Sequence, residues 1–257
     1  MTSRLSAITW NTFREAVRDR VLYNLVLFVL LLVASAPLFS QISIGVEKLM
    51  LVNVGLSSIS LFGVVIAIFL GIGMVSKEIE KKTLYTILSR PVRRWEFIAG
   101  KYLGLLLTLV VNAALMTVGF YIALLIFTGL TKADALLLIA VFFILLQFMI
   151  MVALTLLFST FSSPVFSAIF AFALYVIGTF GEDLKNLANM AHGASKTLIL
   201  CLAYIMPNFA SLNVIFQAAH GQSISGSLVL FNTAYALCYS VAVTAVAVLI
   251  FERRNLK

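Results

Sequence analysis

The chain has 257 residues, of which 62% are hydrophobic and 11% charged, and its mean hydropathy is +1.10. This composition excludes an ordinary soluble domain. It predicts an all-α polytopic membrane protein, because several apolar runs reach the roughly 20 residues needed to cross a bilayer as a helix. The net charge of +8 does not indicate a nucleic-acid partner, because the basic residues gather in a few segments between the apolar runs.

We expect a single transmembrane domain over residues 1–257 with six membrane-spanning helices. The expected spans cover about residues 21–39, 54–76, 98–128, 134–158, 164–180 and 228–251. Of the 18 Lys and Arg residues, 4 precede the first span, 7 lie between Lys77 and Lys101, and 3 follow the last span. With an even number of spans these segments share one side, so the positive-inside rule predicts that both termini are cytoplasmic. We expect the bacterial cytoplasmic (inner) membrane.

Residues 3–20 place apolar and basic side chains on opposite faces at helical spacing. This pattern predicts an interfacial helix on the cytoplasmic leaflet. The alternative is a first span that extends into the cytosol with a charged collar. After the first span we expect a short outer loop that contains Glu47 and Lys48.

Two stripes of small residues recur every four positions in the second and third spans. Such stripes let neighbouring helices approach closely, either within one subunit or at a seam between subunits. The helix-packing residues are Gly63, Ala67 and Gly71 in one stripe, and Gly100 and Gly104 in the other. The second stripe continues into Thr108 and Asn112, which are candidates for a substrate path. An interhelical hydrogen bond is the alternative role for Asn112.

The second half of the chain alternates apolar runs with polar breaks. Thr131 to Asp134 has the form of a capping box before the fourth span. Residues 181–226 contain only a short apolar run within polar sequence. We therefore expect an extracytoplasmic excursion of two or three short helices between the fifth and sixth spans, one of which dips into the outer leaflet.

The sequence contains no phosphate-binding loop, zinc-type histidine pair or dinucleotide fingerprint. We therefore expect no enzymatic activity, no cofactor and no metal bound by this chain. His192 and His220 lie near Met190, Cys201 and Met206 in sequence, and such a set with soft sulfur ligands could bind copper, but the spacing matches no known ligand pattern. Polar surface histidines are the expectation.

The expected spans contain almost no ionisable residues, whereas ion-coupled transporters usually need such groups within the membrane. This absence favours energy from a separate partner and an apolar or amphipathic cargo. The stretch from Lys77 to Lys101 is the candidate for contact with that partner, although a basic loop that binds only anionic lipid would look similar.

Within this stretch an amphipathic helix is expected before Pro91, and Pro91 can start the next helix as its first residue. Glu80 falls on the apolar side of the first helix. It is either a solvated edge position or a partner for Arg93, Arg94 or Lys101 across the elbow.

A helix of the form E-x-E-x-x-T-L, followed by P-V-x-R and then G-K, resembles the first cytoplasmic loop of type-2 ABC exporter permeases. The membrane subunit of the transporter that serves nitrous-oxide reductase maturation is a similar small permease. The matching residues are Glu78, Glu80, Thr83, Leu84, Pro91, Val92, Arg94, Gly100 and Lys101. The outer Pro207-Asn208-Phe209 segment and the six-span layout also fit, so the resemblance covers essentially the whole chain.

The resemblance implies a permease subunit that forms a homodimer and receives two copies of a separate ABC ATPase, which binds ATP and Mg. The cytoplasmic loop at 77–97 would be the coupling helix that seats in the ATPase. The residues expected to make this contact are Glu78, Glu80, Thr83, Leu84, Tyr85, Leu88, Pro91 and Arg94. Two alternatives remain: a subunit that transmits force to an extracytoplasmic accessory protein without moving cargo, and a passive or secondary membrane protein.

Overall fold

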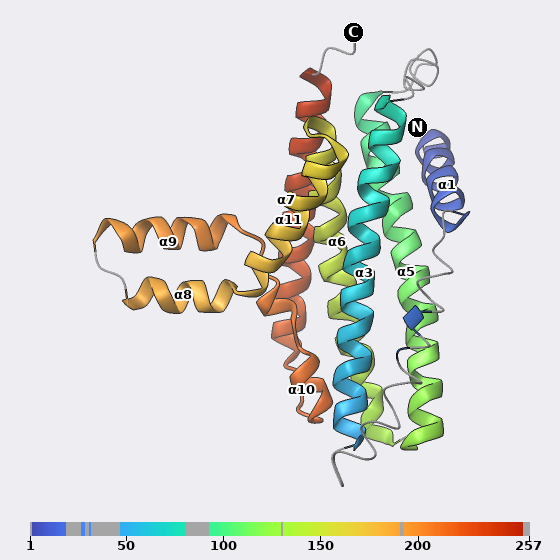
Figure 1. The fold of residues 1–257 in the computed structure, drawn as a ribbon, viewed down its shortest axis with the longest axis vertical. Coiled ribbons are helices and arrows are strands. Elements are labelled where there is room, and N and C mark those ends of the chain that lie inside the picture. Colours follow the sequence, from blue (N-terminus) through green and yellow to red (C-terminus); the bar gives the residue numbers. More distant parts are fainter. Residues whose placement is uncertain are drawn as a thin grey trace.

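The computed structural model describes residues 2–18, 27–28, 31, 47–80, 93–129, 131–190 and 193–253. These residues form helices joined by short loops, and none of them forms a β-strand. Four long helices stand side by side and give the molecule its length (Figure 1). They are α3 (Glu47–Glu80), α5 (Arg94–Phe127), α6 (Leu137–Phe161) and α11 (Gly226–Arg253). The all-helical prediction is confirmed for this part of the chain.

The number of membrane crossings in the described residues is four or five. Four helices are long and apolar enough to cross a bilayer. A fifth crossing results if α7 (Pro164–Thr179) and the first part of α8 (Gly181–Met190), which meet at an angle of 60°, form one bent span. Most of the first expected span, residues 21–39, falls outside the described residues. The sixth crossing therefore stays a prediction.

Helix α3 is longer at both ends than the span expected over residues 54–76. Glu47 and Lys48 lie in its first turn instead of in a loop, and Lys77 to Glu80 continue it at the other end. Both α3 and α5 contain 34 residues, which corresponds to about 51 Å at 1.5 Å per residue. Since a hydrocarbon core is about 30 Å thick, both helices extend beyond it.

Helix α5 begins at Arg94, later than the start expected at Pro91. Arg93 has an extended backbone, and the Glu96 carboxylate accepts a hydrogen bond from the backbone N–H of Arg93 at 3.0 Å. A glutamate that reaches back from the third helical position is a common way to satisfy an N–H group at a helix start. The local sequence thus fixes where the helix begins.

Lys48, Thr131 and Asp134 hold one end of the bundle together. The Asp134 carboxylate accepts from the backbone N–H of Thr131 at 2.6 Å, which confirms the expected capping box. The Lys48 ammonium donates to the same carboxylate at 2.8 Å and to the Thr131 hydroxyl at 3.0 Å. A 3-10 turn, η1 (Lys132–Leu136), leads from here into α6. We call this the Asp134 end, and the opposite end, where α5 begins and α11 finishes, the Arg94 end.

Side chains of α3, α5 and α6 form the main apolar core, in which Phe120, Phe143 and Phe148 are fully buried. Helices α7 and α11 bury far fewer residues and expose large apolar side chains such as Val165 and Phe231. Exposed apolar surface of this extent is typical of a protein covered by lipid or by another subunit.

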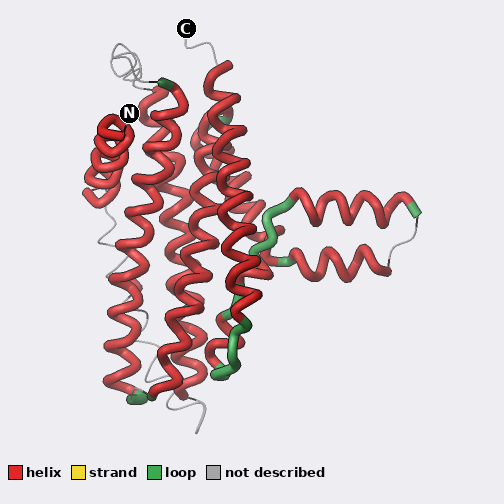
Figure 2. Tube along the Cα trace, turned by 180° about the vertical axis from the view of Figure 1, so that it is seen from behind, coloured by secondary structure: helices red, strands yellow, loops and turns green. Residues whose placement is uncertain are grey.

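Helices α8 and α9 (Ala194–Ile205) project sideways from the bundle as an arm (Figures 1 and 2). The chain then passes through η2 (Ala210–Leu212) and α10 (Ile215–Ala219) toward the Asp134 end before α11 begins. Short helices thus occupy the segment in which the excursion is expected, and its position relative to lipid stays a prediction.

The Pro207-Asn208-Phe209 segment fastens the arm to the bundle. The backbone N–H of Asn208 donates to the Tyr235 hydroxyl at 2.9 Å, and that of Phe209 donates to the Gly178 carbonyl at 3.0 Å. The Phe209 ring is buried and lies 5.6 Å from the Tyr175 ring, centroid to centroid. These contacts join the arm to α7 and α11.

Candidate functional site

In the sequence, the predicted coupling residues run from the last turns of α3 to the first residue of α5. Glu78 and Glu80 are in the last turns of α3, and Arg94 is the first residue of α5. The side chains of both glutamates lie outside the described part of the molecule, as do Thr83, Leu84, Tyr85, Leu88 and Pro91. The structure therefore describes the two helices that flank the predicted coupling helix, and the coupling helix itself stays a prediction.

Arg94 links the start of α5 to the end of α11. One of its guanidinium nitrogens donates to the backbone carbonyls of Phe251 at 3.0 Å and Glu252 at 2.8 Å. The last carbonyls of a helix have no partner within that helix, and the helix dipole favours a positive charge beside them. Arg94 therefore caps α11 from a different helix.

An apolar contact reinforces this link. The rings of Phe97 and Phe251 stack with their centroids 5.7 Å apart and their planes 17° apart. Both residues are buried and form a small cluster with Ile98 and Ala247, apart from the main core. Leu157 of α6 packs against this cluster. The ends of three long helices, α5, α6 and α11, are thus joined where α5 begins.

Helix α1 (Thr2–Arg18) packs lengthwise along the first part of α5 (Figure 1). A Cβ atom on Gly100 would lie 2.6 Å from Ile8, and one on Gly104 would lie 2.6 Å from Thr12. The contacts advance by four residues in both helices, so the two helices run in the same direction. The second small-residue stripe thus allows α1 to pack closely against α5. The interfacial position of α1 stays a prediction.

Helix α1 covers Lys101, which is only 2% exposed to solvent. Its ammonium is 3.8 Å from the Glu15 carboxylate of α1 and 5.8 Å from the centroid of the Phe97 ring. The Glu15 side chain is 45% exposed, so solvent screens this ion pair and its contribution to stability is small.

The sequence also allows a pairing of Glu80 with Arg93, Arg94 or Lys101 across the elbow. The Glu80 side chain lies outside the described residues, so this pairing stays a prediction.

The first small-residue stripe faces α6 of the same chain. A Cβ atom on Gly63 would clash with the Phe148 ring, and one on Gly71 would clash with the Thr155 side chain. Ala67, between them, is buried in the main core. These residues allow α3 and α6 to pack closely within one subunit.

Thr108 and Asn112, the predicted path residues, are both buried in α5. The Thr108 hydroxyl donates to the Gly104 carbonyl at 2.9 Å within the same helix. Neither polar atom of the Asn112 side chain has a hydrogen-bond partner among the described residues. Asn112 therefore forms no interhelical hydrogen bond with any residue that the structure describes.

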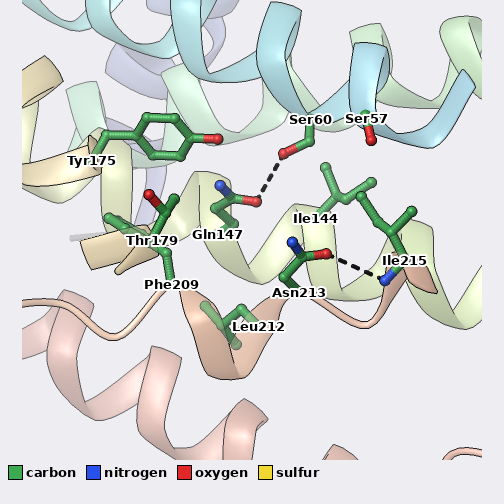
Figure 3. Close-up of a pocket in the computed structure, with 10 residues that line it drawn as sticks. All are labelled: Ser57, Ser60, Ile144, Gln147, Tyr175, Thr179, Phe209, Leu212, Asn213 and Ile215. Carbon is green, nitrogen blue, oxygen red and sulfur yellow. Dashed lines mark hydrogen bonds between the residues drawn. The ribbon is translucent and has the colours of Figure 1, made fainter. Parts of the chain in front are cut away.

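A partly open cavity of about 120 Å³, lined by both polar and apolar side chains, lies elsewhere, between α3, α6, α7 and the segment from η2 to α10 (Figure 3). Gln147 of α6 is at its wall and accepts a hydrogen bond from the Ser60 hydroxyl of α3 at 3.0 Å. The lining residues are Ser57, Ser60, Ile144, Gln147, Tyr175, Thr179, Phe209, Leu212, Asn213 and Ile215. Thr108 and Asn112 do not contribute to it.

The histidines and cysteines give no metal site in the described residues, which contain no group of three potential ligands. His220 is exposed, and its Nδ1 lies 2.8 Å from the Phe216 carbonyl oxygen. Cys201 is exposed on the arm, and His192 lies outside the described residues.

Two features of the site were not predicted from the sequence. Gln147 is the only amide in the apolar run of α6, and a lone polar residue in such a run is a signal that could have identified it. The Phe251 carbonyl that Arg94 binds is 157 residues further along the chain, and no local sequence pattern indicates this contact.

Four helices long and apolar enough to cross a bilayer define a multi-pass integral membrane protein. A family model described as ABC-2 family transporter protein matches residues 6–256. The chain therefore belongs to the ABC-2 transporter family and is a permease subunit of an ABC transporter. In this family the membrane component is not the ATPase itself and normally works with an ATPase partner. No curated protein matches the chain.

Proposed function

We propose that the chain is the transmembrane subunit of an ATP-driven exporter, in which a separate ATPase drives the helices through the segment from Glu78 to Arg94. The observation that carries this proposal is the arrangement at the Arg94 end. There α3 and α5 flank the segment, and Arg94 and Phe97 join α5 directly to the end of α11.

This arrangement suggests how force would enter the membrane domain. A displacement of the coupling helix would act on the last turn of α3 and the first turn of α5. Because Arg94 holds the α11 carbonyls and Phe97 stacks on Phe251, α11 would move together with the start of α5. The buried Lys101 and the tight contact of α1 at Gly104 would carry the same displacement to α1.

ATP and Mg would bind to the partner subunit, and this chain would supply no hydrolytic group. We propose a homodimer with two ATPase copies, in a bacterial inner membrane with both termini cytoplasmic. The position of Arg94 and Arg253 together at one end of the bundle supports this orientation. The sequence supports an apolar or amphipathic cargo, since few ionisable groups occur in the spans.

Co-purification with a co-expressed ABC ATPase tests this function. Reversing both charges with Glu78→Lys and Glu80→Lys should reduce ATPase recovery and ATP turnover in the complex. Glu182→Lys on the arm is the matched control, since Glu182 is exposed on α8. Unchanged assembly and turnover in the double variant would overturn the coupling assignment.

The arm favours one second candidate, a subunit that passes force to an extracytoplasmic accessory protein. Helices α8 and α9 stand clear of the bundle (Figure 2), and Leu187, Met190 and Tyr204 are exposed on them. If this candidate is correct, replacing residues 182–205 with a short linker should abolish accessory-protein binding and leave ATPase assembly intact. Retained accessory-protein binding in that variant would reject it.

A further inference from the structure

Hydrogen-bonding capacity is left unused around the partly open cavity. Gln147 is 7% exposed, and its side-chain oxygen is occupied by the Ser60 hydroxyl. Its amide nitrogen has no hydrogen-bond partner within the described part of the chain. Asn213, which is exposed at the rim, uses its oxygen to accept the Ile215 N–H at 3.3 Å, and its amide nitrogen has no hydrogen-bond partner among the described residues. Each primary amide nitrogen carries two N–H donors. A ligand with acceptor oxygens could therefore form hydrogen bonds in this cavity.

The remaining wall of the cavity indicates an uncharged ligand with some apolar surface. None of the ten lining residues, all of them described, is charged, and an unpaired ion is costly to desolvate in such a site. The Tyr175 hydroxyl can donate or accept, and in Figure 3 it and the Gln147 nitrogen point toward the same space. Ile144 and Leu212 supply apolar surface. A short carbon chain that carries hydroxyl groups could accept hydrogen bonds from the amides and also contact the apolar side chains.

The volume indicates the size of the group that this partly open cavity can hold. A cavity of about 150 Å³ in another protein binds benzene, which has six heavy atoms. At about 120 Å³ this cavity is slightly smaller and suits a compact ligand of similar size. Glycerol also has six heavy atoms and carries three hydroxyls.

We propose that this cavity is a binding site for a small uncharged polyol group, held by the amide N–H groups of Gln147 and Asn213. The group can come from free glycerol or from the terminal glycerol of a phosphatidylglycerol headgroup, since both present the same hydroxyls. This site goes beyond the proposed function and does not depend on an ATPase. If the group belongs to the cargo, the cargo is hydroxylated rather than purely apolar.

Saturation-transfer NMR with free glycerol tests this site on the full chain in phosphatidylcholine nanodiscs. Gln147→Leu removes the donors and keeps the side-chain volume, and should lower the transfer signal roughly tenfold. Ser60→Ala breaks only the hydrogen bond between α3 and α6 and should keep the signal. Gln217→Leu, on the exposed surface of α10, is the matched control. Ile144→Phe leaves the amides in place but fills the cavity, and should also abolish the signal.

The outcomes separate a ligand site from a structural hydrogen bond. Absence of transfer to the wild-type chain, or equal transfer in the wild-type, Gln147→Leu and Ile144→Phe proteins, would overturn the proposal. Loss of signal in Ser60→Ala to the same degree as in Gln147→Leu would also overturn it, because only the interhelical bond would then matter. Nanodiscs with phosphatidylglycerol distinguish the two sources. Suppression of the free-glycerol signal assigns the site to the headgroup, and an unchanged signal assigns it to the free polyol.

Discussion

Replacing Arg94 with alanine should loosen the end of α11 without unfolding the bundle. The change removes both hydrogen bonds from the guanidinium to the carbonyls of Phe251 and Glu252. A buried hydrogen bond from a charged donor is worth about 1.5–3 kcal/mol. Arg94 is only half-buried and water can solvate the released carbonyls, so we expect a total loss of about 1–3 kcal/mol.

Thermal unfolding of the purified chain in detergent measures this loss. For a chain of 150–250 residues each kcal/mol shifts Tm by about 2–4 °C, so Arg94→Ala should lower Tm by about 2–12 °C. Arg93→Ala is the matched control, because it removes the same charge from the exposed neighbouring position. Phe251→Ala, which empties a fully buried position, should cost about 3–5 kcal/mol.

The functional consequence of the same change is measured in the complex with an ATPase. If α5 drives α11 through Arg94, α11 should move less in assembled Arg94→Ala complexes than in assembled wild-type complexes, as seen by spin-label distances between the α11 ends of two subunits. Arg94→Lys should be intermediate, since it keeps the charge but not the guanidinium geometry. Identical melting of Arg94→Ala and Arg93→Ala, with unchanged α11 movement, would refute the reasoning.

Three further substitutions test the packing of the bundle. Gly63→Leu should destabilise the chain by about 1–3 kcal/mol, since its side chain meets the facing phenylalanine ring of α6, whereas Gly73→Leu, with open space around it, should melt like the wild type. Lys48→Met leaves the carboxylate at the Asp134 end without its cation and should cost about 1 kcal/mol, against no change for the exposed Lys196→Met. Asn112→Leu replaces a buried amide that has no hydrogen-bond partner among the described residues, and it should raise Tm or leave it unchanged. A fall in Tm for Asn112→Leu would show that the amide has a stabilising partner.

The sequence predicts the long helices well because their apolar runs exceed what a soluble domain tolerates. It also predicts local features correctly, such as the capping box at Thr131, because the interacting groups are only three residues apart. Helix ends are less accurate: α3 continues through Lys77 to Glu80, whereas the sequence predicts that the second span ends at residue 76 and that a separate amphipathic helix follows. Polar residues continue a helix readily once it has left the hydrocarbon.

The sequence predicts less about which helices meet. A stripe of small residues predicts a close neighbour but does not identify it, and only the structure shows that Gly104 faces α1 while Gly63 faces α6. The same holds for the bond between Ser60 and Gln147, whose partners are 87 residues apart. Periodicity defines the face of one helix, whereas the pairing of faces depends on the packing of all helices together.

Photo-crosslinking from the predicted coupling helix tests the central claim most directly. Tyr85→p-benzoylphenylalanine would place a photoreactive group where the ATPase is expected to bind, and the same change at Tyr204 on the arm is the control. In membranes that contain the assembled complex, illumination should join the Tyr85 variant to the ATPase and leave the Tyr204 variant without that adduct. An intact complex in which the Tyr85 variant labels only lipid would contradict the account.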